Sequence, residues 1–175
     1  MVESAQRTHG EGLEDDEPQQ PTPRWAWGVA GVVVALATVR MVRLVLRATP
    51  LQHNDYWPMI DTMLTSDGGF RLAGVFEFRN EHPLVFAKIL YWLNLQATGG
   101  SNISLGLVVV AIVLAQLGVL LVIARDLGRR WPLLPPLLVA LAGVLLLGRQ
   151  GAWHFMKSMS GAAWLTANLF AISAI

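Results

Sequence analysis

Long stretches of the chain carry only uncharged, mostly apolar side chains, and they set the first expectation for the fold. Residues 104–124 contain no ionisable side chain, and residues 131–148 form a second run of the same kind. A helix needs about 20 apolar residues to cross roughly 30 Å of hydrocarbon. Both runs are close to that length, so the pattern predicts two membrane-spanning helices and not the core of a soluble domain.

Two further apolar segments flank this pair. Residues 25–48 predict a helix about 36 Å long, with Arg40, Arg43 and Arg47 in one stripe at its far end because they are spaced i, i+3 and i+7. Residues 161–175 are apolar and have no polar flank at their end. They predict a fourth spanning helix that is cut short, so we expect the chain to be part of a longer protein.

The long connection 49–103 mixes polar and aromatic residues between the first two spanning segments. Within it, residues 83–97 predict a helix, since Pro83 suits a first turn and Gly99-Gly100 a C-terminus. Lys88, Asn94 and Gln96 are polar exceptions among its mostly apolar residues. At about fifteen residues this helix is too short to span, and we expect it to lie on the membrane surface.

The charged segments predict the orientation. Residues 1–24 are acidic and rich in proline, which is typical of a disordered tail and not of a signal peptide. Arg125, Arg129 and Arg130 crowd the tight turn after residue 124, and such turns lie on the cytoplasmic side. The tail is then cytoplasmic and the connection 49–103 is outside, although the arginine stripe at the outer end of the first helix runs against the same rule.

Composition agrees with an all-α fold of polytopic transmembrane helices, with a large first extracytoplasmic loop carrying an interfacial helix. Hydrophobic residues make up 54% of the chain and charged residues 14%, against about a quarter charged in soluble domains. The chain has no cysteine, which excludes disulfides and thiol-ligated metals within it. The few basic residues at 125–130 are too small a patch for nucleic-acid binding.

The first candidate for chemistry is Asp55, which follows the first helix closely and stands beside Tyr56 and Trp57. If these rings hold the carboxylate against the membrane, it is partly desolvated and suited to act as a general base towards an acceptor hydroxyl. The other interpretation is a solvated loop aspartate, or a cap for a helix that begins near Pro58. Asn102-Ile103-Ser104 also matches a glycosylation acceptor, but it adjoins the membrane.

Glu81 and His82 form a second candidate at the start of the predicted helix 83–97. They either assist Asp55 across a cleft or simply compensate the helix dipole. Together with His53 and Asp55 they could gather round a divalent ion, but a lone Glu-His pair lacks the spacing of a metal site. We therefore expect no cofactor, while a divalent metal stays open.

A third candidate set is cationic. Arg40, Arg43 and Arg47 are suited to hold the phosphate of a lipid-linked substrate, because guanidinium groups bind phosphate in a bidentate manner. Lys157 lies in the next outer connection and is a further phosphate partner. The alternative for all four is that long side chains extend to the lipid headgroups without binding a substrate.

Three motifs carry a resemblance to a known family. The segments Asp55-Tyr-Trp-Pro-Met-Ile60 and Asn80-Glu-His-Pro83, and Trp153 with Asn168-Leu-Phe-Ala-Ile172, resemble signatures of bacterial proteins in the C-type glycosyltransferase superfamily (GT-C). The order of tail, helix, large outer loop and tightly linked helices over residues 25–175 is also similar. Pro83 and His154 depart from the pattern, where those proteins carry arginine and glutamate.

The resemblance implies an enzyme of the plasma membrane that transfers a sugar from a polyprenyl-phosphate donor to a cell-envelope glycan or lipid acceptor on the outer face. It implies that Asp55 is the base or positions the acceptor, assisted by Glu81 and His82, and that Tyr56 and Trp57 contact substrate. The alternative is a non-enzymatic multi-pass protein, either a fragment of a transporter or a scaffold subunit. A transporter usually has ionisable residues at mid-membrane depth, and the segments 104–124 and 131–148 have none.

Overall fold

The computed structural model describes residues 21–52, 55–78, 84–127, 131–148 and 157–174. In these ranges the ordered elements are helices, with one isolated bridge between Leu64 and Phe70, so the predicted all-α class is confirmed. The helices are α1 (Arg24–Leu46), α2 (Tyr56–Asp61), α3 (Leu72–Phe76), α4 (Val85–Thr98), α5 (Asn102–Leu127), α6 (Leu134–Leu146) and α8 (Ser158–Ser173).

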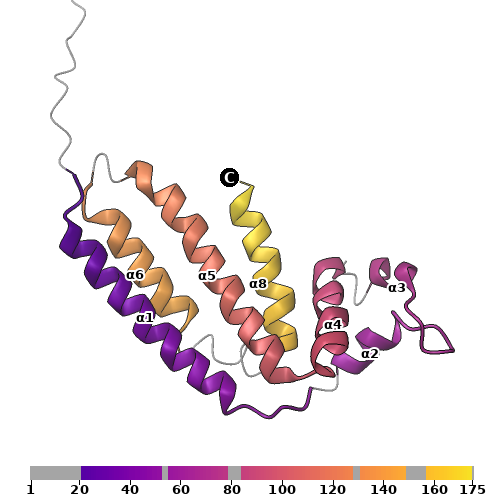
Figure 1. Ribbon diagram of the computed structural model, residues 1–175. Coiled ribbons are helices and arrows are strands. Elements are labelled where there is room, and N and C mark those ends of the chain that lie inside the picture. Colours follow the sequence, from indigo (N-terminus) through magenta and orange to yellow (C-terminus); the bar gives the residue numbers. More distant parts are fainter. Residues whose placement is uncertain (1–20, 53–54, 79–83, 128–130, 149–156, 175) are drawn as a thin grey trace, which may run out of the picture.

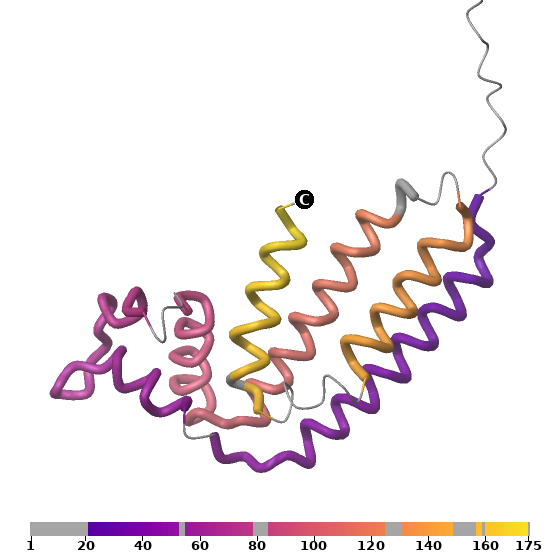
Figure 2. The backbone as a smooth tube through the Cα atoms, turned by 180° about the vertical axis from the view of Figure 1, so that it is seen from behind, coloured from indigo at the N-terminus to yellow at the C-terminus, as the bar shows by residue number. Residues whose placement is uncertain are grey.

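Four apolar helices lie side by side in one row. Figures 1 and 2 show the order α1, α6, α5 and α8 across the molecule, with α6 packed between α1 and α5 and with α5 paired to α8. The three short helices of the first connection, which we call the α2–α4 unit, stand beyond α8, on the side opposite α1. The end of α1 and the starts of α5 and α8 lie at the same end of the row.

Among the described residues, two helices are long and apolar enough to cross a membrane, namely Arg24–Leu46 and Asn102–Ala124. In their most apolar windows only 17% and 33% of the residues are buried inside the protein. The core helix of a soluble domain is mostly buried, so these apolar surfaces need another cover, and this supports a membrane location. Helix α6 has 13 residues, about 20 Å of rise, which is shorter than the run 131–148 predicted. Pro135 and Pro136 occupy its first turn and fix where it begins.

The helix predicted at residues 83–97 is present as α4, and its predicted end is confirmed. Gly99 caps it in the left-handed region with φ of 63°, and Gly100 follows with φ of 77°. Their N–H groups donate to the carbonyl oxygens of Leu95 and Asn94. A side chain at either position would be strained. This short turn reverses the chain between α4 and α5, so α4 lies alongside α8 and does not extend away from the bundle (Figure 2).

The α2–α4 unit depends on a close backbone approach at Gly74 in α3. A Cβ atom added at Gly74 would overlap the carbonyl oxygen of Thr62. The same oxygen accepts hydrogen bonds from Arg71, at 3.1 Å from Nε and 2.7 Å from Nη2. Arg71 also pairs with the Glu77 carboxylate at 2.7 Å. Gly74 therefore allows α3 to fold back on the end of α2.

We expect Gly74→Ala to destabilise the α2–α4 unit by about 2–3 kcal/mol, the cost of overpacking against a fixed backbone. Thermal unfolding of the detergent-solubilised protein measures the effect. Gly118→Ala in α5 is the matched control, because a Cβ there meets nothing within 4 Å. The control is expected to be neutral or slightly stabilising. Equal melting temperatures for the two variants would contradict the close approach.

Candidate functional site

A buried asparagine joins three segments at the end of the row where α1 finishes. Asn102 has no exposed surface. Its Nδ2 donates to the carbonyl of Thr49 at 3.0 Å, and its backbone N–H donates to that of Pro50 at 2.9 Å. Ser158 at the start of α8 donates from its N–H to Asn102 Oδ1 at 3.3 Å and from its Oγ to the Asn102 carbonyl at 2.8 Å. We call this set the Asn102 junction.

The junction holds the backbones that carry two of the predicted cationic residues, Arg47 and Lys157, at the same end of the bundle. Arg47 caps the C-terminus of α1, two residues before Thr49. Lys157 occupies the N-cap position of α8 and adjoins Ser158. Since Thr49 and Ser158 both contact Asn102, the backbones of Arg47 and Lys157 are held at the same end of the bundle. The sequence predicted this shared side from topology alone.

The arginine stripe lines a hollow on the flank of α1. A cavity of about 390 Å³ is bordered by Leu36, Val39, Arg40, Met41, Arg43, Leu44, Arg47 and Gly148. All three guanidinium-bearing residues are exposed, and the remaining lining is apolar. A phosphate attached to an apolar chain needs cations for the phosphate and an apolar wall for the chain, and such a hollow offers both. A second hollow of about 490 Å³, between α1, α5 and α6, is lined by apolar residues and by Thr38, and offers no charge.

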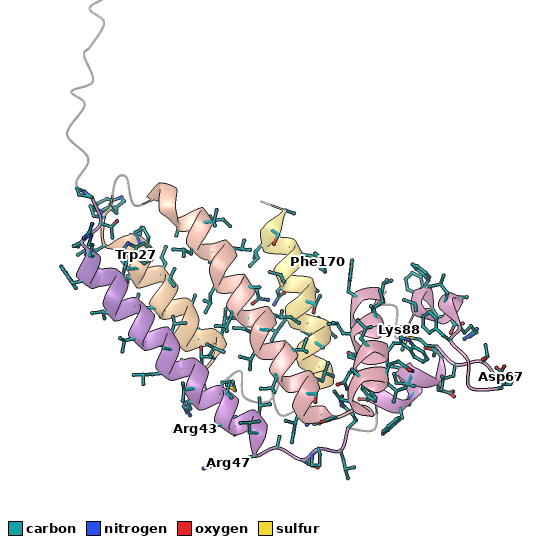
Figure 3. The ribbon with its side chains drawn as sticks, viewed as in Figure 1. Trp27, Arg43, Arg47, Asp67, Lys88 and Phe170 are labelled. Atoms are coloured by element: carbon teal, nitrogen blue, oxygen red, sulfur yellow. The ribbon has the colours of Figure 1, made fainter. Side chains whose placement is uncertain are left out.

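The arginine hollow and Asp55 do not share a pocket among the described residues. Arg43 and Arg47 point away from α5 and α8 in Figure 3, whereas the α2–α4 unit lies on the far side of α8. Asp55 directly precedes α2. The structure therefore brings these groups to one end of the molecule but leaves them on opposite flanks.

Asp55 has a fixed backbone position at the start of α2, and its carboxylate does not cap that helix. It occupies the N-cap position of α2, yet its side chain makes no capping hydrogen bond. The side chain is exposed. Of the two neighbouring rings, Tyr56 turns into the core and Trp57 stays exposed, so the predicted desolvation against a membrane stays a prediction that depends on Trp57. A carboxylate fixed at a helix start and open to solvent remains accessible to an incoming hydroxyl group.

Tyr56 is an anchor and has no surface left for a substrate. Its side chain is fully buried, and its hydroxyl donates to the Tyr91 carbonyl at 2.9 Å. The same hydroxyl oxygen accepts a hydrogen bond from Asn94 Nδ2 at 3.3 Å. Burial raises the pKa of the Tyr56 phenol, and the Asn94 hydrogen bond offsets part of this rise. The phenol therefore stays neutral at physiological pH and works as a hydrogen-bond donor that fixes the start of α2 against α4.

Trp57 is the aromatic neighbour that stays available. It is 49% exposed and meets the Tyr56 ring edge-on, with ring centroids 5.2 Å apart. An exposed indole beside a carboxylate offers a flat apolar surface for a sugar or a lipid chain. The predicted substrate contact is compatible with the place of Trp57, and it stays a prediction.

Lys88 is a buried cation with structural partners, whereas the sequence pattern showed it only as a polar exception in an apolar helix. Its side chain is 1% exposed. Its Nζ donates to the carbonyl oxygens of Gly74 at 2.6 Å and Glu77 at 2.8 Å. The available signal was a single lysine in the middle of an apolar helix, since a cation in that setting needs buried partners.

Several predicted site residues lie outside the described residues, namely His53, Glu81 and His82. Their proposed assistance to Asp55 and the open question of a divalent metal stay predictions. Within the described ranges, no group of three or more histidine and acidic side chains could hold a metal ion.

Comparison of the chain with protein-family models, with curated protein sequences and with solved structures finds no match. The resemblance to C-type glycosyltransferases therefore rests on the motifs and on the order of the elements.

Proposed function

We propose that this chain is the N-terminal part of an integral membrane glycosyltransferase that takes its sugar from a polyprenyl-phosphate donor. The observation that carries the proposal is the Asn102 junction, which holds the segments bearing Arg47 and Lys157 at one end of the helix row. Asp55 starts α2, which Tyr56 ties to α4. A transferase for a lipid-linked sugar needs phosphate-binding cations and a base at the same membrane surface.

The proposal includes a membrane arrangement. Helices α1 and α5 cross the bilayer, and α6 and α8 join them as shorter segments of the same multi-pass bundle. The N-terminus is cytoplasmic, so the Asn102 junction and the α2–α4 unit face the outside. Each apolar flank of the row then meets lipid or further helices, and the basic turn after α5 lies on the cytoplasmic side.

In this arrangement the arginine hollow receives the donor phosphate. Arg40, Arg43 and Arg47 supply fixed positive charge where an apolar wall begins, which matches a phosphate attached to a prenyl chain. When the bond between the sugar and the phosphate breaks, negative charge grows on the departing phosphate. Guanidinium groups stabilise that charge most when it is greatest, in the transition state. Lys157 contributes from the start of α8.

Asp55 acts on the acceptor. Its carboxylate takes the proton of the acceptor hydroxyl while the hydroxyl oxygen forms a bond to the anomeric carbon of the sugar. The bond from that carbon to the phosphate oxygen breaks, and polyprenyl phosphate leaves with the bonding electrons. Because Asp55 and the arginines lie on opposite flanks, the proposal requires the donor to extend across the junction end of the row, so that its anomeric carbon reaches Asp55.

Replacement of the Asp55 carboxylate by an amide tests the proposal. In the complete protein, Asp55→Asn should lower sugar transfer by at least about a hundredfold, because the amide cannot accept the proton. The assay follows labelled sugar from a panel of synthetic polyprenyl-phosphate sugars into membrane material. Asp61→Asn is the matched control, since Asp61 is also exposed and ends the same helix. Full transfer by the Asp55 variant would refute the assignment.

A non-enzymatic scaffold is the second candidate, and one observation favours it. The arginine hollow opens on the flank of α1 that points away from the other helices, where a partner protein could bind without involving Asp55 (Figure 3). For a scaffold, both carboxylate variants would leave every measurable activity unchanged, whereas Arg43→Gln would release the partner. The enzyme therefore requires Asp55 beside α2, whereas the scaffold requires only the arginine flank of α1.

A further inference from the structure

Two hollows on the surface of α1 adjoin at one residue. The arginine hollow and the apolar hollow of about 490 Å³ between α1, α5 and α6 both have Val39 in their lining. The first is lined by Arg40, Arg43 and Arg47, and the second has no ionisable side chain in its lining. We call the second hollow the α1–α5 groove. A cationic site and an uncharged groove therefore follow one another along the same helix.

The groove follows one row of side chains on α1. Trp27, Gly31, Ala35, Val39 and Arg43 are spaced by four residues. Such a row is inclined to the helix axis by about 26°, so it passes gradually round α1 from the arginine flank to the side that faces α5. The first four members line the groove, and the last two line the arginine hollow. A slender apolar chain that follows this row passes from one hollow into the other.

The middle of the row is hollow because its side chains there are small. Gly31 and Ala35 are exposed, and a Cβ atom added at Gly31 would meet nothing within 4 Å. Glycine is less favourable than alanine inside a helix, and no neighbour in the described part of the chain requires its small size here. Leu114 and Leu121 of α5 form the opposite wall. The structure therefore leaves space at Gly31 for a ligand.

The length of the row distinguishes between the lipids that fit it. Trp27 and Arg43 lie near opposite ends of α1 (Figure 3), 16 residues apart. This separation corresponds to a rise of about 24 Å. One leaflet supplies about half of the roughly 30 Å of hydrocarbon in a bilayer. The acyl chains of a phospholipid stay within one leaflet and would leave the inner part of the groove empty, whereas a longer chain can follow the row to Trp27.

The number of apolar paths that leave the arginines also distinguishes between lipids. A third hollow, of about 250 Å³, lies between α1 and α6, but it shares no residue with the arginine hollow. A phospholipid has two acyl chains, and each would need an apolar path from the phosphate. Of these hollows, the α1–α5 groove is the one that adjoins the arginines. This arrangement favours a lipid phosphate with a single chain.

We propose that the α1–α5 groove binds the single long chain of a lipid whose phosphate occupies the arginine hollow, and that Gly31 and Ala35 select this chain. The inference rests on the proposed function, which assigns the donor phosphate to the arginines, and it adds the path of the chain. Bilayer lipid is as apolar as the groove, so the groove acts by shape and close packing and not by the hydrophobic effect. The contacts between guanidinium groups and phosphate anchor the head of the lipid.

Photochemical labelling of the full chain in phospholipid vesicles tests the proposal. The probe is a polyprenyl phosphate with a diazirine near the far end of its chain. The reference probe has the same chain and the same diazirine but ends in a hydroxyl group, so it reports ordinary contact with lipid. Peptide mass spectrometry locates the labelled residues. We expect the phosphate probe to label the groove around Trp27 and Leu121 several-fold more than the reference probe does.

Two glycines of α1 provide a matched pair of variants. Gly31→Leu fills the groove, whereas Gly28→Leu places the same side chain outside the groove lining. A Cβ atom at either position meets nothing within 4 Å, so neither substitution disturbs the packing of the helices. Gly31→Leu should remove the excess labelling by the phosphate probe, and Gly28→Leu should retain it. Arg43→Gln should lower the excess several-fold, because the phosphate loses a cation.

Four other results would overturn the proposal. Equal labelling by the two probes would show that the phosphate does not hold the chain, and excess labelling that persists in Gly31→Leu would show that the chain takes another path. Full displacement of the probe by inorganic phosphate, or displacement by phosphatidic acid as effective as by unlabelled polyprenyl phosphate, would identify a different occupant. A smaller assembly of Gly31→Leu in native mass spectrometry would show that a second copy fills the groove.

The labelling experiment and the test of sugar transfer fail separately. Asp55→Asn should label like the unsubstituted chain, because the carboxylate lies outside both hollows. If groove labelling is absent while Asp55→Asn still abolishes transfer, the path of the chain is wrong and the enzyme assignment stands. If groove labelling is present while Asp55→Asn transfers sugar normally, the lipid site stands without the assigned base.

Discussion

Lys88→Met is expected to destabilise the α2–α4 unit by about 3–5 kcal/mol. Methionine has nearly the same length as lysine but donates no hydrogen bond. The carbonyl oxygens of Gly74 and Glu77, which lie 2.6 and 2.8 Å from Lys88 Nζ, would lose this donor inside the protein. Each buried acceptor without a partner costs about 1–3 kcal/mol, and more where the lost donor is charged. The end of α3 should then separate from α4.

Amide hydrogen exchange of the full chain in lipid nanodiscs measures this loss locally. Amides of α4 should exchange roughly a thousandfold faster in the variant, since each 1.4 kcal/mol is a factor of ten, while those of α5 keep their protection. Ile89→Met is the control, because it places the same side chain one residue away on the exposed face. Unchanged exchange in Lys88→Met would show that other donors satisfy these carbonyls.

Asn102→Leu is expected to have the second large effect, about 2–5 kcal/mol. The substitution keeps the size of the buried side chain but removes its amide. The Thr49 carbonyl then loses the donor at 3.0 Å, and the N–H of Ser158 loses the acceptor at 3.3 Å. Ser158, like Asn102, has no exposed surface, whereas Thr49 is exposed, so most of the expected loss arises at Ser158. The chain after α1 should come away from the starts of α5 and α8.

Thermal unfolding of the solubilised protein, combined with exchange of the amides at 47–52 and 158–161, measures this effect. Ser101→Ala is the matched control, because the neighbouring Oγ accepts only the long bond of 3.4 Å from the Ser104 N–H. If the glycosyltransferase proposal holds, Asn102→Leu should also reduce sugar transfer, since the segments with Arg47 and Lys157 lose their common support. If the Asn102 variant were as stable as the Ser101 variant, the side-chain contacts of Asn102 would not hold the three segments together.

The helices themselves were predictable, because the chain marks their ends chemically. Apolar runs gave α1 and α5 to within a few residues, and the Gly99-Gly100 pair gave the end of α4. Helix α6 is shorter than its apolar run because composition alone does not locate a helix start. Trp131 and Pro132 are as apolar as the residues after them, but Pro135 and Pro136 set the first turn.

Which side of the short helix α2 faces the core was not predictable from its own residues. Asp55, Tyr56 and Trp57 follow one another, so the sequence allowed all three to face a substrate. The six residues of α2 instead turn Tyr56 into the core, where Tyr91 and Asn94 of a distant segment receive its hydroxyl. Only those partners, more than thirty positions away, decide which of the three side chains stays outside.

Helix α4 buries polar side chains and exposes apolar ones, and this was hidden for a related reason. The sequence shows where Lys88 and Asn94 stand on the helix, and it shows the apolar stripe of Phe86, Ile89 and Leu93. It does not show which stripe faces the protein, because helical period is the same whether water or lipid is the solvent. The carbonyls of Gly74 and Glu77 settle the matter, and they belong to another element.

The enclosure of Asn102 has a practical consequence for producing the protein. Asn102-Ile103-Ser104 has the tripeptide pattern that glycosylating enzymes of eukaryotic secretory cells read. An asparagine amide that already holds the Thr49 carbonyl and the Ser158 N–H, with no exposed surface, presents no nitrogen for a sugar chain. A glycan attached at this position in such a host would therefore mark chains that were modified before their helix ends came together.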